Sequence, residues 1–214
     1  LIAHRGASAY APENTLVAMR KAHAMGARWV EFDVMLAGDG TPIIMHDDHL
    51  SRTTSGSGLV VDTPYQEIKT LDAGRWFGAD FIGEAVPSLA ELLHCLLALD
   101  MDINIEIKPT KGKAAATAAR TLEVLFAHWP CERKPPLISS QDLACLQVVH
   151  QRAPELALAA VIHEWHEDWQ AWVQDYRCVA VAVNHHILNR PMVTYVKEIV
   201  PLVIAYTVNR TARA

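Results

Sequence analysis

The sequence lacks two features that would assign it to common classes of protein. Its 19 basic residues are outnumbered by 24 acidic ones and are mixed with them along the chain, so no basic patch could neutralise a run of phosphates. No apolar run approaches the roughly 20 residues that span a bilayer. We therefore expect no nucleic-acid partner and no integral association with a membrane.

Cysteine is also scarce. The four cysteines are widely spaced, form no Cys-x-x-Cys pair and lie mostly in apolar surroundings, as reduced structural cysteines do. This favours a reducing compartment and predicts a cytoplasmic protein. The chain begins at Leu1 without an initiator Met, so any signal peptide would have preceded this numbering.

What the chain does have is an alternation of short β-rich runs with helix-length segments, which is typical of β-α-β units around a parallel sheet. A (β/α)₈ TIM barrel needs eight strands and about 250 residues. We therefore predict an α/β barrel as a single domain over 1–214, with the final helix and strand, due after Thr211, absent. The predicted strands are 1–4, 29–34, 103–108, 137–139, 157–162, 179–183 and 202–208.

Helix ends are marked by residues with known capping roles. Pro12 is expected to open a helix that closes at Gly26, and Ser88 with Glu91 forms a capping box for another. Asn189 and Pro191 open the last helix. Residues 47–87 interrupt the alternation with glycines, aromatics and no long helix, so we expect an inserted subdomain after strand two, packed on the barrel mouth.

The most informative feature is charge inside predicted strands. Glu31 and Asp33 are two residues apart and share one face of their strand, and Glu106 is placed in the same way in another. Both faces of a barrel strand are covered, so three inward carboxylates would be costly unless paired or bound to a cation. Hard oxygen ligands suit Mg²⁺, Ca²⁺ or Mn²⁺ better than zinc. An ion-pair network of these carboxylates with Arg5 and Lys108 is the alternative.

Two histidines end strands on the same side of the predicted barrel. His4 precedes Arg5, and His46 precedes Asp47, which could orient it. A pair of imidazoles can divide acid and base roles near neutral pH. Carboxyl ends of strands are where barrel enzymes keep their active sites.

Nine short motifs follow one another along the chain from residue 2 to about 210. They are His4-Arg5-Gly6, Pro12-Glu13-Asn14-Thr15, Glu31-Phe32-Asp33, Asp39-Gly40, His46-Asp47, Arg52-Thr53, Pro87-Ser88-Leu89, Glu106-Ile107-Lys108 and Thr207-Val208-Asn209. In these motifs and in their order the chain resembles the glycerophosphodiester phosphodiesterases, most closely their compact cytosolic bacterial branch.

The resemblance implies hydrolysis of glycerophosphodiesters, such as glycerophosphocholine and glycerophosphoethanolamine, to glycerol 3-phosphate and an alcohol, through a cyclic phosphate. It implies one divalent cation, held by the carboxylates of Glu31, Asp33 and Glu106. His4 and His46 would be the general acid/base pair. The implied phosphate-binding residues are Arg5 and Lys108. Tyr206, where many relatives have Trp, could form an aromatic wall near the glycerol. Phe81, in the insertion over the barrel mouth, could form a substrate wall or belong to a small local core.

Two other functions stay open at this point. A phospholipase acting on intact lipid would need an exposed apolar rim on the insertion, whereas a non-catalytic barrel would bind a phosphorylated metabolite without turnover. The sequence also leaves open the alcohol head group and the oligomeric state, a homodimer included.

Overall fold

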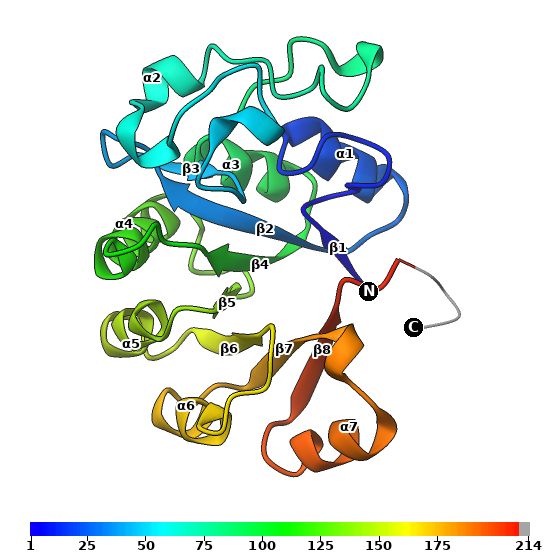
Figure 1. The fold of residues 1–214 in the computed structure, drawn as a ribbon, viewed down its shortest axis with the longest axis vertical. Coiled ribbons are helices and arrows are strands. Elements are labelled where there is room, and N and C mark those ends of the chain that lie inside the picture. Colours follow the sequence, from blue (N-terminus) through cyan, green and yellow to red (C-terminus); the bar gives the residue numbers. More distant parts are fainter. Residues whose placement is uncertain (210–214) are drawn as a thin grey trace.

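The structure, a computed structural model, describes residues 1–209. Seven parallel strands form one curled sheet in chain order, with helices outside it and a short antiparallel strand paired to β2 (Figure 1). The predicted α/β barrel of repeating β/α units is confirmed. The strands are β1 (Ile2–His4), β2 (Trp29–Leu36), β3 (Pro42–Ile44, the antiparallel one), β4 (Asp102–Ile107), β5 (Leu137–Ser140), β6 (Ala157–Ile162), β7 (Ala180–Asn184) and β8 (Leu202–Tyr206). The helices are α1 (Leu16–Ala24), α2 (Tyr65–Ile68), α3 (Leu89–Ala98), α4 (Ala114–His128), α5 (Leu143–Arg152), α6 (Trp169–Asp175) and α7 (Arg190–Lys197).

The edge strands of the sheet are β1 and β8, and no ladder joins them within residues 1–209. Their carboxyl ends nevertheless meet, because Thr207 Oγ1 lies 3.5 Å from His4 Nε2. The sheet therefore curls far enough to bring the first and last strands to one place. The segment from Thr211 onward, where the sequence predicts the start of a missing unit, lies outside the described residues.

The main core lies between the outer face of the sheet and the helices. Alternate strand residues such as Phe32 and Ile105 point outward, and α3 buries Leu92, Leu93 and Leu96 against them. A smaller cluster fills the inner face with Leu137, Ala159 and Ala180. Because side chains alternate along a strand, the remaining inward positions at the carboxyl ends are free to carry polar groups.

Local capping explains where the helices begin. The capping box predicted at Ser88 and Glu91 is present, and Asn189 caps α7. The first helix, however, begins at Leu16 rather than at the predicted Pro12. Asn14 adopts a left-handed conformation (φ 60°), and the hydroxyl of Thr15 accepts from the Ala18 amide, which sets the helix start there.

Residues 47–87 contain only α2 and short 3-10 turns, and they have a hydrophobic cluster of their own. Leu50, Val60, Tyr65 and Ile68 belong to this cluster, together with Met35 of β2 and Ile43 of β3. Figure 1 shows this segment above β3 and α1, at one end of the barrel. Within residues 1–209, no helix combines the length and the apolar character that crossing a bilayer requires.

Candidate active site at the carboxyl ends of the strands

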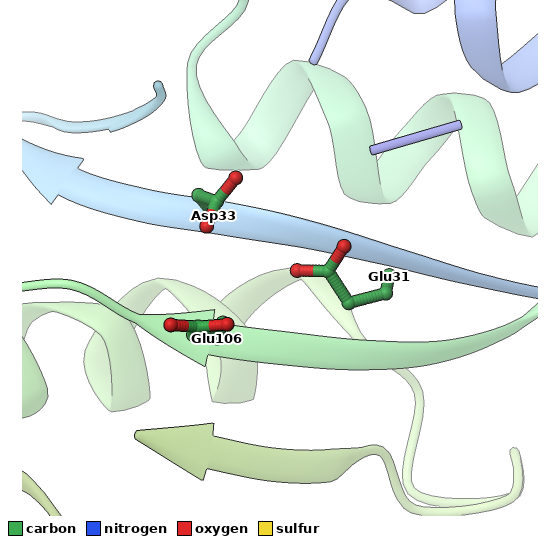
Figure 2. Close-up of side chains that lie close together, drawn as sticks. All are labelled: Glu31, Asp33 and Glu106. Atoms are coloured by element: carbon green, nitrogen blue, oxygen red, sulfur yellow. The ribbon is translucent and has the colours of Figure 1, made fainter. Parts of the chain in front are cut away.

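Three carboxylates, Glu31, Asp33 and Glu106, form an acidic cluster on the inner face of the sheet. Asp33 of β2 is paired in register with Glu106 of β4, and Glu31 lies two residues back on the same face. One oxygen from each group lies within 4.8 Å of the others. Figure 2 shows the three carboxyl groups side by side on these two adjacent strands.

The cluster is electrostatically costly as it stands. Glu31 is 7% exposed and Asp33 is 1% exposed. Burial, together with the charges of the neighbouring carboxylates, raises the pKa of Glu31 well above its ordinary value and raises the pKa of Glu106 to about 7. Among the described residues, Glu31 Oε1 is buried without a hydrogen-bond partner. A buried carboxyl oxygen without a partner is uncommon in folded proteins, because burying a polar atom without a hydrogen bond is costly.

Two basic residues border the acidic cluster. Arg5 Nε lies 3.2 Å from Asp33 Oδ2, and the Arg5 backbone amide donates to Glu31 Oε2 at 3.0 Å. Arg5 has φ 54°, an uncommon conformation that lets its amide and its side chain both face the cluster. Lys108 Nζ lies 3.8 Å from Glu106 Oε1. The two cations offset only part of the negative charge, since both Glu31 and Glu106 keep raised pKa values.

His4, at the end of β1, lies beside Glu31 of the acidic cluster. Its Nε2 lies 3.9 Å from Glu31 Oε2 and 3.5 Å from Thr207 Oγ1. Burial, with the charge of Arg5, lowers the pKa of His4 to about 4. The imidazole is therefore neutral near pH 7 and can accept a proton.

His46 follows β3 and is held by its neighbour in the chain. His46 Nδ1 lies 2.6 Å from Asp47 Oδ1. A carboxylate can only accept, so Nδ1 carries a proton and Nε2 is left for chemistry. His46 and Asp47 both line a cavity of about 620 Å³, which also reaches Glu106 and Lys108. His46 and Glu106, one member of the acidic cluster, thus line the same cavity.

Loop residues surround these groups and hold several of them by hydrogen bonds. Asn14 Nδ2 donates to Asp33 Oδ2 at 2.8 Å, and Glu13 accepts from both Arg5 and Arg52. Arg52 belongs to the Arg52-Thr53 motif, but the sequence alone indicates no role for its side chain. The signal in the sequence was the presence of Glu13, Asn14 and Arg52 in motifs that resemble those of the family.

The two predicted aromatic walls differ in their surroundings. Tyr206 ends β8 near the cluster, and burial, with the charge of Glu106, raises its pKa to about 12. Phe81 instead packs edge-on against Phe77, which packs in the same way against Trp76. Phe81 is not among the residues that line the 620 Å³ cavity. Its surroundings favour a small local core.

A model of the glycerophosphoryl diester phosphodiesterase family matches residues 4–214. The chain belongs to this family. A glycerophosphodiester phosphodiesterase of Bacillus subtilis is 31% identical, over 99% of this chain and 77% of its own. One from Caldanaerobacter subterraneus subsp. tengcongensis is 36% identical, over 78% of this chain and 70% of its own.

Solved structures of family members extend the comparison to the fold. A phosphodiesterase from Oleispira antarctica, solved in complex with the product sn-glycerol-3-phosphate, is 39% identical to this chain. It superposes with a TM-score of 0.95, over 99% of this chain and 85% of its own. The family predicted from the sequence motifs is confirmed. The prediction that the chain is an enzyme, a glycerophosphodiester phosphodiesterase, is confirmed as well.

Proposed function

We propose that the chain hydrolyses glycerophosphodiesters, such as glycerophosphocholine and glycerophosphoethanolamine, to glycerol 3-phosphate and a free alcohol. The observation that carries this proposal is the convergence of three carboxylates, two basic side chains and two imidazoles at the carboxyl ends of barrel strands. The product bound to the Oleispira relative has the chemistry that such a site would accommodate.

We further propose that Glu31, Asp33 and Glu106 hold one divalent cation. Three oxygen donors within 4.8 Å of one another and an unpartnered buried oxygen on Glu31 fit a hard ion, namely Mg²⁺, Ca²⁺ or Mn²⁺. When bound, such an ion supplies positive charge that stabilises negative charge developing on phosphoryl oxygens. It would also relieve the mutual repulsion that raises the pKa values of the two glutamates.

The protein's own residues divide the remaining work. Arg5 and Lys108 would bind and orient the phosphoryl oxygens, because each carries fixed donors at the edge of the cluster. One imidazole of the pair His4 and His46 would take the proton of the substrate's glycerol hydroxyl as its oxygen forms a bond to phosphorus. The other would protonate the alcohol oxygen as its bond to phosphorus breaks.

The hydroxyl that attacks is already tethered to the phosphorus, so no separate nucleophile has to be recruited. The product of this first step is a cyclic phosphate and a free alcohol. Water then adds to phosphorus and the ring opens, with the two imidazoles exchanging roles. His4 is neutral near pH 7 and has a ring nitrogen that can accept a proton. In His46, Nδ1 is bonded to Asp47, and Nε2 is available for proton transfer.

A second candidate function, hydrolysis of intact phospholipid, is favoured by one observation. Trp76 is 40% exposed and Ile82 is 51% exposed, and both lie on the inserted segment. These side chains could contact a lipid surface. Release of phosphorylated product from vesicles, with no turnover of soluble glycerophosphocholine, would favour this candidate over the first.

The test is release of glycerol 3-phosphate from glycerophosphocholine by purified protein supplied with Mg²⁺, Ca²⁺ or Mn²⁺. We expect turnover by the wild type and by Glu155→Gln, a surface control, and a loss of at least about a hundredfold in His46→Ala and Glu106→Gln. A folded wild type that releases no product with any of the three ions would refute the proposal. Binding of glycerol 3-phosphate without turnover would identify the non-catalytic barrel instead.

A further inference from the structure

Arg52 joins the loop after β1, which carries Glu13, to the loop after β3, which carries Asp47. It belongs to the inserted segment, in the short 3-10 helix Leu50–Arg52. Its Nε and Nη2 donate to the two oxygens of Asp47 at 2.5 and 2.9 Å. Its Nη1 and Nη2 donate to the two oxygens of Glu13 at 3.0 and 2.8 Å. One guanidinium therefore makes two bidentate carboxylate contacts.

Each of the two carboxylates is also hydrogen-bonded to a different residue of the candidate active site. Asp47 accepts from His46 Nδ1, and Glu13 accepts from Arg5 Nη1 at 2.8 Å. Arg5, Glu13, Arg52, Asp47 and His46 thus form one continuous chain of contacts, which we call the ionic chain. Arg52 is its central link, because no other hydrogen bond or ion pair within residues 1–209 joins Asp47 to Glu13.

The two carboxylates of the ionic chain, Asp47 and Glu13, are held in their ionised form. The hydrogen bonds from Arg52 keep the pKa of Asp47 well below its ordinary range. Burial works to raise the pKa of Glu13, but hydrogen bonds from Arg52 and Arg5 outweigh it and lower that pKa. Both carboxylates are therefore anionic at neutral pH. Two cations and two anions alternate, and the chain has no net charge apart from His46.

We infer that Arg52 is a positioning residue for His46, acting through Asp47. Asp47 is 28% exposed at its side chain, so without a fixed partner its carboxylate could rotate toward water. Arg52 fixes both oxygens in one plane, and Oδ1 then receives the His46 Nδ1 proton. The inference rests on the proposed function, since it concerns how His46 is oriented for that reaction.

Lysine could not replace arginine in this arrangement. Its single ammonium cannot form the two-sided, planar set of four contacts that Arg52 makes with Asp47 and Glu13. Arg52→Lys therefore keeps the charge and removes the geometry. Arg120→Lys is the matched control, because Arg120 is a half-exposed arginine paired with Glu123 on α4 and has no contact with the ionic chain.

The first experiment measures kcat and KM on glycerophosphocholine. We expect Arg52→Lys and Arg52→Gln to lower kcat by about tenfold or more while KM changes less than about threefold, because acid/base orientation is lost and phosphate binding is kept. Arg120→Lys should match the wild type. Wild-type kcat in Arg52→Lys, or a loss that appears only as a higher KM, would overturn the inference.

A double-mutant cycle separates action through Asp47 from a general structural effect. We expect Asp47→Asn to lower kcat strongly, and Arg52→Gln to cause less than about a twofold further loss in that background. Losses that multiply in the double variant would show that Arg52 acts independently of Asp47 and would refute the proposed role.

A spectroscopic readout tests the same inference without turnover. The Nδ1 proton of His46, in a contact of 2.6 Å, should give a downfield proton NMR signal that is absent in His46→Ala. We expect this signal to be lost in Asp47→Asn, weakened in Arg52→Gln and unchanged in Arg120→Lys. An unchanged signal in Arg52→Gln would contradict the inference. Should the wild type show these signals but no phosphodiesterase activity, the proposed function would fail and the positioning role would stand.

Discussion

Neutralising one carboxylate of the acidic cluster should stabilise the metal-free protein, although it removes a proposed metal ligand. Glu106 has a side chain only 18% exposed, and burial with the charge of Asp33 raises its pKa from the ordinary 4.5 to about 7. That difference corresponds to about 3 kcal/mol, because a tenfold change in an ionisation constant is worth about 1.4 kcal/mol. The folded protein carries this cost whenever the carboxylate is ionised.

The sign follows from the direction of the shift. A raised pKa means that the folded state holds the proton more tightly, so the associated stability is fully present below about pH 4.5 and is lost as the pH rises through about 7. The cost of ionising Glu106 is about 1 kcal/mol at pH 5.5 and about 3 kcal/mol at pH 8.5. Glu106→Gln has no such titration, and its advantage over the wild type should grow by about 2 kcal/mol between these pH values.

Urea unfolding followed by tryptophan fluorescence, in excess chelator at pH 5.5 and pH 8.5, measures this advantage. We expect Glu106→Gln to exceed the wild type in free energy of unfolding at pH 8.5, and Glu155→Gln to match the wild type at both pH values. Adding Mn²⁺ should then stabilise the wild type more than Glu106→Gln. Equal stabilities of Glu106→Gln and the wild type at pH 8.5 in chelator would refute the argument from burial.

Three further perturbations can be tested by their effect on stability. Chelation should lower the thermal midpoint of the wild type, since an ion at 100 times its Kd contributes about 2.7 kcal/mol, and a midpoint that ignores divalent ions would argue against the site. Gly6→Ala should lower the free energy of unfolding, measured in urea, by about 2 to 4 kcal/mol, because Gly6 has φ 79° and an added Cβ would lie 2.8 Å from the Ala18 backbone. A decrease below about 1 kcal/mol would contradict this expectation. Burial works to raise the pKa of Glu91, but hydrogen bonds from Tyr65 and its other partners lower it to about 2, so Glu91 contributes stability above pH 4.5 that is lost as the pH falls through about 2. Because its side chain is 41% exposed, we expect Glu91→Gln to cost only about 1 kcal/mol at pH 7 and almost nothing at pH 2, and an equal cost at both would refute the assignment.

The acidic cluster could be predicted from sequence because strand geometry is periodic. Two residues separated by one along a strand share a face, so Glu31 and Asp33 had to point together. A polar residue on a strand covered on both faces is conspicuous, which also identified Glu106. The inference that two strands contribute to one cluster needed only that they lie side by side in a parallel sheet, and β2 and β4 do so.

The ionic chain could not be predicted in the same way. Glu13, Asp47 and Arg52 lie in irregular segments, where no period relates position in the sequence to direction in space. The predicted start of the first helix at Pro12 was wrong for a related reason. The left-handed conformation of Asn14 delays the start of α1 to Leu16, and the presence of Pro12 in the sequence does not reveal it. Loop conformation, rather than strand pattern, decides which polar groups surround the cluster.

Part of the inner face beside the acidic cluster is apolar, which adds to the electrostatic cost of its three carboxylates. β6 and β7 carry Ala159 and Ala180 on the inward face, in register through β5 with the row that holds Glu106. The alanines offer neither donors nor charge. Ser139, which lies between them and Glu106 in this row, has a buried hydroxyl oxygen without a hydrogen-bond partner among residues 1–209. Charges interact more strongly in such surroundings than in water. The burial that costs the metal-free protein stability is therefore the same feature that would favour a divalent ion at the site, and a polar residue placed at Ala159 should weaken both effects together.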